Sequence, residues 1–561
     1  MRVILATLFL VVLLSSSYAL AQSPNGSIRG IVLDPDTKSI PGAEIIVVND
    51  LTGSKYVTAT NAEGIYGVES LPPGPYHIQV SRVGFKAIIK PDIILIVQDA
   101  LTINFTLPIG AASVVVTVEG GAPMINTTDA AVSTVVDRHF AENLPMNGRS
   151  FQTLIYLTPG VVAVSSSSFD NGQFSVNGQR ASANYWMVDG VGANIGVGAP
   201  VFGNPANGFG GAAGSFSALG GTNSLVSVDA MEEFRIQTST YAPEFGRTPG
   251  GQISIVTRSG TNQFHGTAFN YLRNDALDAN NWFNGSVVPT LPKPEERQND
   301  FGGTVSGRIL KDRTFFFFSY EGLRLRLPQT TLSHVPDLEA RRNAVPAIQP
   351  YLNSFPLPTP NQADVGPGIA PLNDSYSNPA TLDAYSLRVD HKLGNKLALF
   401  GRYNYSPSEF EDRGGTGFQA LSVVVPSRIA TQTATAGATW SISTVLTNDL
   451  RFNYSYVDAK SFNYLAGFQG AVPLTTLPFP DTFNSQNGQL DFCIFGLGLG
   501  SCLDVGENIH NVQRQNNVVD GLSWQKGFAQ LEVRSGSSTA ISSIWSPEIL
   551  SRGGFLYCNG F

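Results

Sequence analysis

Residues 227–266, SVDAMEEFRIQTSTYAPEFGRTPGGQISIVTRSGTNQFHG, decide how this 561-residue chain is organised. Two runs within them, 234–238 and 252–257, alternate apolar and polar side chains, as half-buried strands do. A Pro-Gly-Gly breaker separates the runs, and a turn at 259–262 precedes the next strand. At this turn a glycine-rich α/β pattern gives way to long alternating strands with aromatic ends, so we place a domain boundary at residue 260.

Length, charge and composition narrow the functional classes. A chain this long exceeds one core, and about three domains are expected. Charged residues make up 14% of the chain, the formal net charge is −8, and the Lys and Arg residues form no basic patch, so we expect no nucleic-acid partner. The 57 glycines, the 10% aromatic content and only three cysteines favour a mainly β protein that does not depend on disulfides.

Residues 1–22 have the pattern of a cleaved secretory signal peptide. Arg2 gives the positive start, residues 3–14 form the apolar run, and an Ala-Leu-Ala site places the cut between Ala21 and Gln22. The run is short for the alternative, a membrane anchor helix. No later stretch has 18 uninterrupted apolar residues, so a membrane-spanning form of the chain must be a β-barrel.

Residues 26–110 contain short strands separated by Pro/Gly turns, which predicts a small β-sandwich. The ordered motifs P-G-A, T-N-A-E-G-I-Y, L-P-P-G-P-Y and V-G-F resemble those of the carboxypeptidase-regulatory-like domain, a prealbumin-like sandwich. This resemblance implies no peptidase activity. Carbohydrate binding is compatible with the fold, but Tyr66 and Tyr76 fit core or edge positions better.

One short pattern has the spacing of a zinc pair. His139 and Glu142 in H-F-A-E would need a third ligand, for which His265 is the distant candidate. A pattern this short often arises by chance and counts only in the right structural context. No Ser-His-Asp or Cys-His arrangement stands out either. We therefore expect no catalytic residue, no metal site and no cofactor.

Residues 111–128 form a linker with a β-branched run. Two interpretations of this run stay open: it is the last strand of the sandwich, or it is a mobile strand that adds to the sheet edge of a partner. The run comprises Val114, Val115, Val116, Thr117 and Val118.

Residues 129–260 have the pattern of a small α/β domain. Apolar residues at three- and four-residue intervals predict a helix over 132–143, and a second helix is expected over 151–157. Two strands, each closed by a turn, follow at 174–180 and 185–190.

An ordered set of motifs in this region resembles the plug and first barrel strand of TonB-dependent outer-membrane receptors, and in particular their Oar-like group, which carries an N-terminal carboxypeptidase-regulatory-like domain. The motifs are L-P-M-N-G-R-S-F, T-P-G-V, F-S-V-N-G-Q-R, V-D-G-V, V-D-A-M-E-E-F-R-I-Q-T, Y-A-P-E-F-G-R-T-P-G-G and V-T-R-S-G-T-N-Q-F-H-G.

This resemblance implies a Gram-negative outer-membrane location, contact with outer-membrane lipid, and an unknown extracellular ligand such as a siderophore, a glycan or a peptide. It also makes residues 114–118 the candidate TonB box, the segment that pairs with a TonB-like energy-coupling protein of the inner membrane.

A plug must be polar where it meets the wall of its barrel, and several of its charges are candidates for pairing with the lumen. Ordinary surface charge explains each of them equally well, because isolated exposed pairs contribute little. The candidates are Glu232, Glu233, Arg235, Glu244, Arg247 and Arg258.

Residues 261–561 show the alternation of membrane strands, with one face suited to lipid and the other to water. The clearest segments are 385–392, 397–405 and 450–457. A soluble sandwich alternates in the same way, but strand length and aromatic placement favour a barrel.

Loops rich in Pro and Asn are expected outside the cell, at about 284–300, 327–380 and 458–490. Cys493 and Cys502 are candidates for a disulfide in that oxidising setting, which leaves Cys558 over.

The barrel region has room for on the order of 10 to 12 strands, about half of what a plugged barrel needs. The strand pattern is also lost after Trp524, and residues 535–540 do not resemble a membrane strand. We therefore expect an incomplete barrel in a truncated chain. The fold class expected is mainly β: a prealbumin-like sandwich, an α/β plug and a partial antiparallel transmembrane barrel.

The function expected is energy-coupled uptake of a nutrient by a TonB-dependent receptor. The alternative is a cell-surface carbohydrate-binding or adhesion protein that does not transport, and an enzyme is a distant third.

Overall fold

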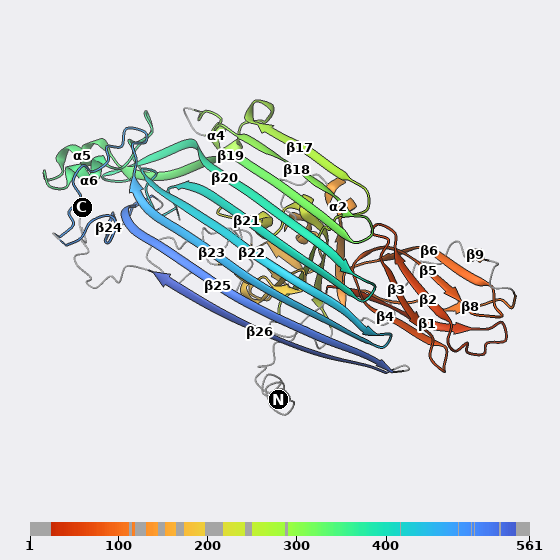
Figure 1. Cartoon of the computed structure of the whole chain (residues 1–561). Helices are drawn as coiled ribbons and strands as arrows, with labels where there is room; N and C mark the ends of the chain where they lie inside the picture. The colour runs from red at the N-terminus through yellow and green to blue at the C-terminus, as the bar shows by residue number, and fades with distance from the viewer. Residues whose placement is uncertain are drawn as a thin grey trace.

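The computed structural model confirms a mainly β chain built from a sandwich, a plug and one long-stranded sheet (Figure 1). The structure describes residues 24–110, 115–117, 131–143, 152–163, 173–196, 217–241, 249–286, 290–526 without 416, 481, 495 and 499, and 529–545. Within these ranges no helix is long and apolar enough to cross a membrane.

The N-terminal sandwich consists of two sheets packed face to face. The first has the order β4-β1-β7, with β8 also paired to β1, and the second has the order β3-β2-β5-β6-β9. The strands are β1 (Gly26–Leu33), β2 (Glu44–Asn49), β3 (Lys55–Ala59), β4 (Ile65–Leu71), β5 (Gly74–Ser81), β6 (Ala87–Leu95), β7 (Ala100–Thr102), β8 (Phe105–Thr106) and β9 (Val115–Thr117).

Alternating apolar residues of both sheets fill the sandwich core. Tyr66 and Tyr76 are buried there, and their hydroxyls donate to the carbonyls of Ile103 and Pro72 over 2.8 and 2.6 Å. Each ring is thus buried with its hydroxyl hydrogen-bonded, and of the two positions expected for these tyrosines, core or edge, the structure shows the core.

The plug is built on a five-stranded sheet of order β10-β15-β16-β13-β14. Its strands are β10 (Val132–Asp137), β13 (Tyr185–Val188), β14 (Val191–Gly192), β15 (Met231–Ser239) and β16 (Gln252–Thr257). Beside them lie the short pair β11 (Val161–Ala163) and β12 (Phe174–Val176), the helices α2 (Arg138–Asn143) and α3 (Gln152–Ile155), and the 3-10 turns η2 (Ala181–Ala183), η4 (Thr222–Ser224) and η5 (Val228–Ala230).

The structure confirms strands β15 and β16 within residues 227–266, and it corrects the helix expected over 132–143. Only Arg138–Asn143 is helical. Residues Val132–Asp137 form β10, which pairs antiparallel with β15. The segment is rich in β-branched residues, and the open edge of β15 offers it a full ladder of hydrogen bonds, so pairing prevails over the helical spacing.

Ten strands form one antiparallel sheet after the plug, in the order β17-β18-β19-β20-β21-β22-β23-β25-β24, with β26 also paired to β25. They are β17 (His265–Asn274), β18 (Arg297–Leu310), β19 (Thr314–Pro336), β20 (Ile369–Leu393), β21 (Leu397–Arg413), β22 (Val423–Ser443), β23 (Leu446–Leu465), β24 (Gln489–Cys493), β25 (Cys502–Lys526) and β26 (Ala529–Trp545). Long tilted strands curve around the plug elements, and the sandwich lies beyond one end of them (Figure 1).

The two faces of this sheet differ as the alternation predicts. On β20, Tyr385 and Leu387 are exposed at 40% and 46%, whereas Ser386 between them is buried against the plug side. On β23 the outward Leu450 and Phe452 are likewise exposed. An apolar outer face and a polar, covered inner face are the arrangement of a membrane barrel wall.

Two expectations for this region are wrong. Much of the loop expected over 327–380 belongs to β19 and β20, which pair from Thr314↔His391 to Pro336↔Ile369. Residues 535–540, expected not to be a strand, lie within β26. Their Ser, Thr and Gly side chains give a weak pattern, but the backbone extends the ladder of β25 along 17 paired residues.

The connection between β19 and β20 carries α5 (Leu338–Asn343) and α6 (Gln349–Asn353), and η6 (Asp275–Leu277) and α4 (Trp282–Ser286) connect β17 to β18. The helices α5 and α6 pack on a small apolar cluster that includes Phe355, Val423 and Phe492. This cluster caps the end of the sheet opposite the sandwich (Figure 1).

Candidate functional site

The plug meets the barrel wall through a tight turn at Asp189 and Gly190, which joins β13 to β14. Both residues have positive φ, 50° and 79°, as a two-residue hairpin with the twist of its strands requires. Because β13 pairs in parallel with the central strand β16, the turn is held at a fixed position on the plug sheet. The V-D-G-V motif therefore presents one carboxylate to the barrel from a rigid support.

The Asp189 carboxylate is 2% exposed and is bound from the plug and from the barrel. Thr257 of β16 donates its backbone N–H and its hydroxyl to it, over 2.9 to 3.0 Å. From the barrel, Arg388 of β20 approaches to 3.3 Å and Arg402 of β21 to 3.7 Å. A third arginine, Arg451 of β23, donates to the backbone carbonyl of Asp189.

The charges at this junction balance. Arg388 also pairs with Asp390 at 2.8 Å, and Arg451 pairs with Asp449 at 2.9 Å. Three guanidinium groups therefore meet three carboxylates, and the ring of Phe400 lies beneath both Arg388 and Arg451. We call Asp189, Thr257, Arg388, Arg402 and Arg451 the plug lock.

The rest of the described plug–barrel contact consists mainly of single hydrogen bonds, among them one that Asn223 of the plug donates to the carboxylate of Glu321. Arg402 donates to the carbonyl of Leu225 over 2.9 Å, and Asn404 donates to that of Ser224 over 3.2 Å. Asn517 of β25 donates to the carbonyl of Gly192, also over 3.2 Å. A hydrogen bond between neutral groups contributes about 1 kcal/mol and one that involves a charged group about 1.5–3 kcal/mol, so the plug lock, which combines several charged contacts, is the strongest described attachment of the plug.

The physical consequence is a plug that is anchored but not covalently fixed. Breaking a buried ion pair by removing one partner costs about 3–5 kcal/mol, because the other charge is left buried. Withdrawing the intact Asp189 side chain would expose both partners to water, which hydrates them and lowers that penalty. The arrangement can therefore hold the plug at rest and release it under a pulling force.

Two of the charges expected to face the lumen face the sandwich instead. Arg235 of β15 is buried and donates to the carbonyls of Val97 and Gln98 in the sandwich, over 3.3 and 3.1 Å. Glu233 on the same strand accepts from the backbone of Val97, and burial raises its pKa to about 8, with Glu232 adding to the effect. The sandwich is thus joined to the plug by buried polar groups, and the expectation for both residues is corrected.

The other candidates differ in outcome. Arg258 does meet the barrel, since its guanidinium lies 5.0 Å from the centre of the Phe317 ring. Glu232 lines a cavity beside the plug lock. Glu244 and Arg247 lie outside the described residues. The sequence analysis missed Asp189, although its Asp-Gly turn and the inward arginines of the alternating strands were visible signals.

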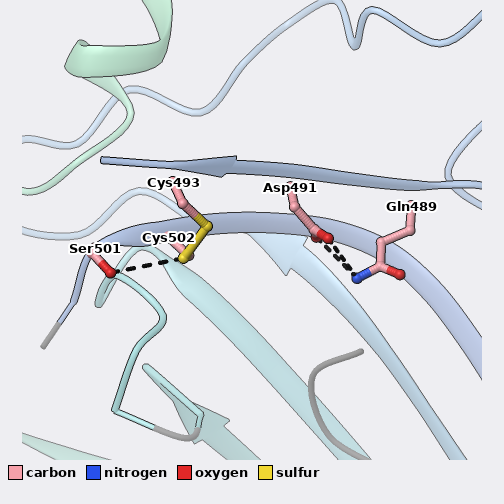
Figure 2. Close-up of a disulfide and its surroundings, with 5 residues drawn as sticks. All are labelled: Gln489, Asp491, Cys493, Ser501 and Cys502. Atoms are coloured by element: carbon pink, nitrogen blue, oxygen red, sulfur yellow. Dashed lines mark hydrogen bonds between the residues drawn. A yellow bond between two sulfur atoms is a disulfide. The ribbon is translucent and has the colours of Figure 1, made fainter. Parts of the chain in front are cut away.

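Cys493 and Cys502 are joined by a disulfide that links β24 to the start of β25 (Figure 2). The two positions are directly opposite each other in the ladder, and Asp491 faces Asp504 two pairs further along. Burial raises the pKa of Asp491, and Gln489 donates to both of its carboxylate oxygens over 2.9 and 3.1 Å (Figure 2).

Cys493, Cys502 and Asp504 are the group of described side chains close enough together to hold a metal ion. The disulfide occupies both sulfur atoms, so this group offers a metal no thiolate as it stands.

The remaining predicted positions are distributed as follows. Val115–Thr117 form β9, which pairs in parallel with β6, whereas Val114 and Val118 lie outside the described residues, as do Ala21, Gln22 and Cys558. His139 and Glu142 belong to α2, but their side chains are not described. His265 begins β17 and is exposed.

Comparison with known proteins gives matches at both ends of the chain. Residues 27–108 match the carboxypeptidase regulatory-like domain, and residues 256–345 and 339–533 match the outer membrane beta barrel domain. The TonB-dependent transporter Oar of Myxococcus xanthus is 27% identical over 476 residues, which cover 80% of this chain and 39% of the relative. The chain therefore spans about two fifths of the length of the curated relative it matches.

Several solved structures are similar at low sequence identity. The outer membrane transporter YddB of Escherichia coli has a TM-score of 0.46 at 11% identity, over 73% of this chain and 48% of that chain. A variant of the ferric enterobactin receptor PfeA of Pseudomonas aeruginosa, in complex with enterobactin, has a TM-score of 0.45 at 13% identity, over 74% and 50%. The copper transporter OprC has a TM-score of 0.41 at 9% identity, over 74% and 46%.

Proposed function

From the premise that this chain is a homologue of the TonB-dependent transporter Oar, with a carboxypeptidase regulatory-like domain and an outer membrane β-barrel domain, we propose that it acts as an energy-coupled receptor of the Gram-negative outer membrane. In this proposal the chain is exported by a signal peptide cleaved between Ala21 and Gln22, the sheet faces lipid, and the plug is drawn aside to admit an extracellular nutrient.

The plug lock is the observation that carries this proposal. A protein that only binds at the cell surface has no need for a separate domain held against the inner face of its sheet by a buried carboxylate. Here Asp189 reaches arginines on three strands, whereas the neighbouring contacts are mainly single hydrogen bonds. Because the strongest contact is concentrated at one turn, breaking it would free the plug to move as a unit or to unfold starting from that turn.

The coupling segment in this proposal is residues 114–118, which would pair with a TonB-like protein of the inner membrane. Two observations support it. The described part, β9, is the terminal strand of its sheet, and three residues pair it to β6, from Ala87↔Val115 to Ile89↔Thr117. A short parallel edge strand can be exchanged for a partner strand, because main-chain hydrogen bonds supply the affinity in either pairing.

The cap at the far end of the sheet supports an extracellular binding face. It is built from α5, α6 and the β24–β25 hairpin, and the disulfide of Cys493 and Cys502 suits an oxidising exterior. The ligand classes proposed remain siderophore, glycan and peptide.

Site-specific photo-crosslinking tests the coupling proposal. Val116 is replaced by a photoreactive phenylalanine analogue in living cells, and the matched control carries the same analogue at Val57, an exposed position of β3. The proposal expects a crosslink from position 116 to the energy-coupling protein and none from position 57. A crosslink from position 116 that stays within the chain would count against coupling.

The pairing of β9 with β6 also favours a second function, in which the segment is simply the last strand of the sandwich and the chain is a surface carbohydrate-binding or adhesion protein. Deletion of residues 114–118 separates the two, because it abolishes uptake under the first proposal and leaves surface binding unchanged under the second.

A further inference from the structure

A cavity of about 480 Å³ lies where the sandwich, the plug and the barrel meet, at the sandwich end of the long strands. Its walls come from all three parts of the chain: Asn49 and Tyr56 from the sandwich, Glu232 and Arg258 from the plug, and the strand ends and turns of the barrel. A volume of this size accommodates a small organic molecule.

The wall of this cavity is strongly cationic in a chain whose net charge is −8. Seven Lys and Arg side chains line it against three Asp and Glu side chains, and because Arg451 is paired with Asp449, which does not line the cavity, the remaining excess is three positive charges. Enclosing like charges in a concave, partly desolvated space concentrates their field and attracts counter-ions. The cavity therefore has the positive charge expected of an anion-binding site.

Three of these cations have no ion-pair partner among the residues that the structure describes. Arg313 lies in the turn between β18 and β19, Lys392 lies near the end of β20, and Lys396 lies in the turn before β21. Among the described residues, none of the three has a carboxylate within ion-pair distance. Lys392 donates to the carbonyl of Lys55 over 3.2 Å, and Lys396 donates to that of Ile442 over 3.4 Å.

Two of the acidic residues of the wall, in contrast to these cations, are engaged in ion pairs. Asp189 and Asp390 are both paired with Arg388, at 3.3 and 2.8 Å. Their charges are thus compensated by Arg388 and, for Asp189, also by Arg402, so the cations on the adjacent turns are available to a ligand.

The sandwich side of the cavity is neutral but polar. Asn49 and Tyr56 line it, and the ammonium of Lys392 lies 5.2 Å from the centre of the Tyr56 ring. Burial raises the pKa of Tyr56 to about 12, so its hydroxyl keeps its proton at neutral pH. This side supplies neutral hydrogen-bonding groups but adds no negative charge to repel an anion.

We propose that this cavity binds a small multiply charged anion, a phosphorylated or polycarboxylate solute, between the turns of Arg313, Lys392 and Lys396 and the face of the sandwich. The site does not require that the chain transport anything. Because its two walls belong to the sandwich and the barrel, an occupied site also links these two parts of the chain.

The test is a calorimetric binding titration of the purified full chain in detergent micelles at low salt. Pyrophosphate represents phosphates, propane-1,2,3-tricarboxylate represents carboxylates, and sucrose is a neutral probe of similar size. Binding of either anion but not of sucrose is expected, with affinity that falls as salt screens the charges. Binding of one anion only assigns the site to that chemistry, and equal binding of sucrose, or no binding of either anion, overturns the proposal.

Variants locate the site. Lys392→Gln combined with Lys396→Gln is expected to weaken anion binding at least tenfold. Lys311→Gln, a charge removed from the same turn as Arg313 but outside the cavity wall, is expected to change it less than twofold. Equal affinities of the double variant and the wild type would refute the assignment.

A chemical footprint gives an answer that does not depend on how the double variant folds. In the wild-type chain, bound pyrophosphate or tricarboxylate should slow acetylation of Lys392 and Lys396 several-fold and leave that of Lys311 unchanged. Equal rates at all three lysines with and without anion would place the bound ion elsewhere and refute the site.

Discussion

Glu233 should make the stability of the sandwich–plug junction depend on pH. Its side chain is 4% exposed, it faces Val97 of the sandwich, and its carboxyl is surrounded by Glu232, Asp137 and Asp99. Burial raises its pKa from 4.5 to about 8. The folded chain therefore keeps this proton through a pH range in which the unfolded chain has lost it.

The direction and size of the effect follow from that difference. Below pH 4.5 both states hold the proton, and the site contributes its full stability. Between pH 4.5 and about 8 the free energy of unfolding falls as pH rises, by about 1.4 kcal/mol per pH unit. The total loss is on the order of 5 kcal/mol, and it levels off above pH 8, where the folded chain also releases the proton.

Glu233→Gln should remove this dependence, because the amide is neutral at every pH and its oxygen can still accept from Val97. The assay is urea unfolding of the sandwich and plug in detergent at several pH values, with limited proteolysis as the measure of the unfolded fraction. Wild type and variant should be alike at pH 4 and differ by several kcal/mol at pH 8, with the variant more stable. Glu63→Gln, at an exposed turn of the sandwich away from this carboxyl, is the control. Parallel pH profiles of wild type and Glu233→Gln would refute the reasoning.

Three further predictions concern the lock, the lipid face and the cap. Asp189→Asn should destabilise the seated plug by about 3–5 kcal/mol, measured as faster protease cleavage of the plug, whereas the exposed Asp520→Asn should have no effect. Leu387→Arg should cost about 2–4 kcal/mol of stability in a bilayer if the residue lies near the midplane, while Leu338→Arg, exposed on α5, should cost little in the same unfolding titration. Cys493→Ser together with Cys502→Ser should destabilise the β24–β25 hairpin by roughly 3 kcal/mol, seen as faster amide exchange there, with the rest of the sheet unchanged.

The sequence predicted what depends on local periodicity. The alternation over 385–392 and 450–457 correctly separates exposed Leu387 and Phe452 from buried Ser386 and Arg451, because each strand side chain is assigned to a face by its neighbours alone. The turns and motifs around β15 and β16 were predictable for the same reason.

Features that depend on distant pairing were not predictable. Arg388 and Arg451 meet Asp189 across 199 and 262 residues of sequence, and no local pattern specifies that meeting. The strand Val132–Asp137 exists because β15 lies beside it, and β26 exists because β25 does. An arginine at an inward strand position indicates that a partner for its buried charge is needed, but the sequence does not identify the residue that supplies that partner.

The central claim is that the ten-stranded sheet is a membrane wall with lipid on one face and the plug on the other. A nitroxide scan of residues 384–389 on β20, in outer membranes from expressing cells, tests it most directly. Labels at 385, 387 and 389 should be accessible to oxygen dissolved in lipid and shielded from a water-soluble relaxant, and labels at 384, 386 and 388 should be shielded from the lipid phase. Accessibility to the water-soluble relaxant at 385, 387 and 389 would contradict it.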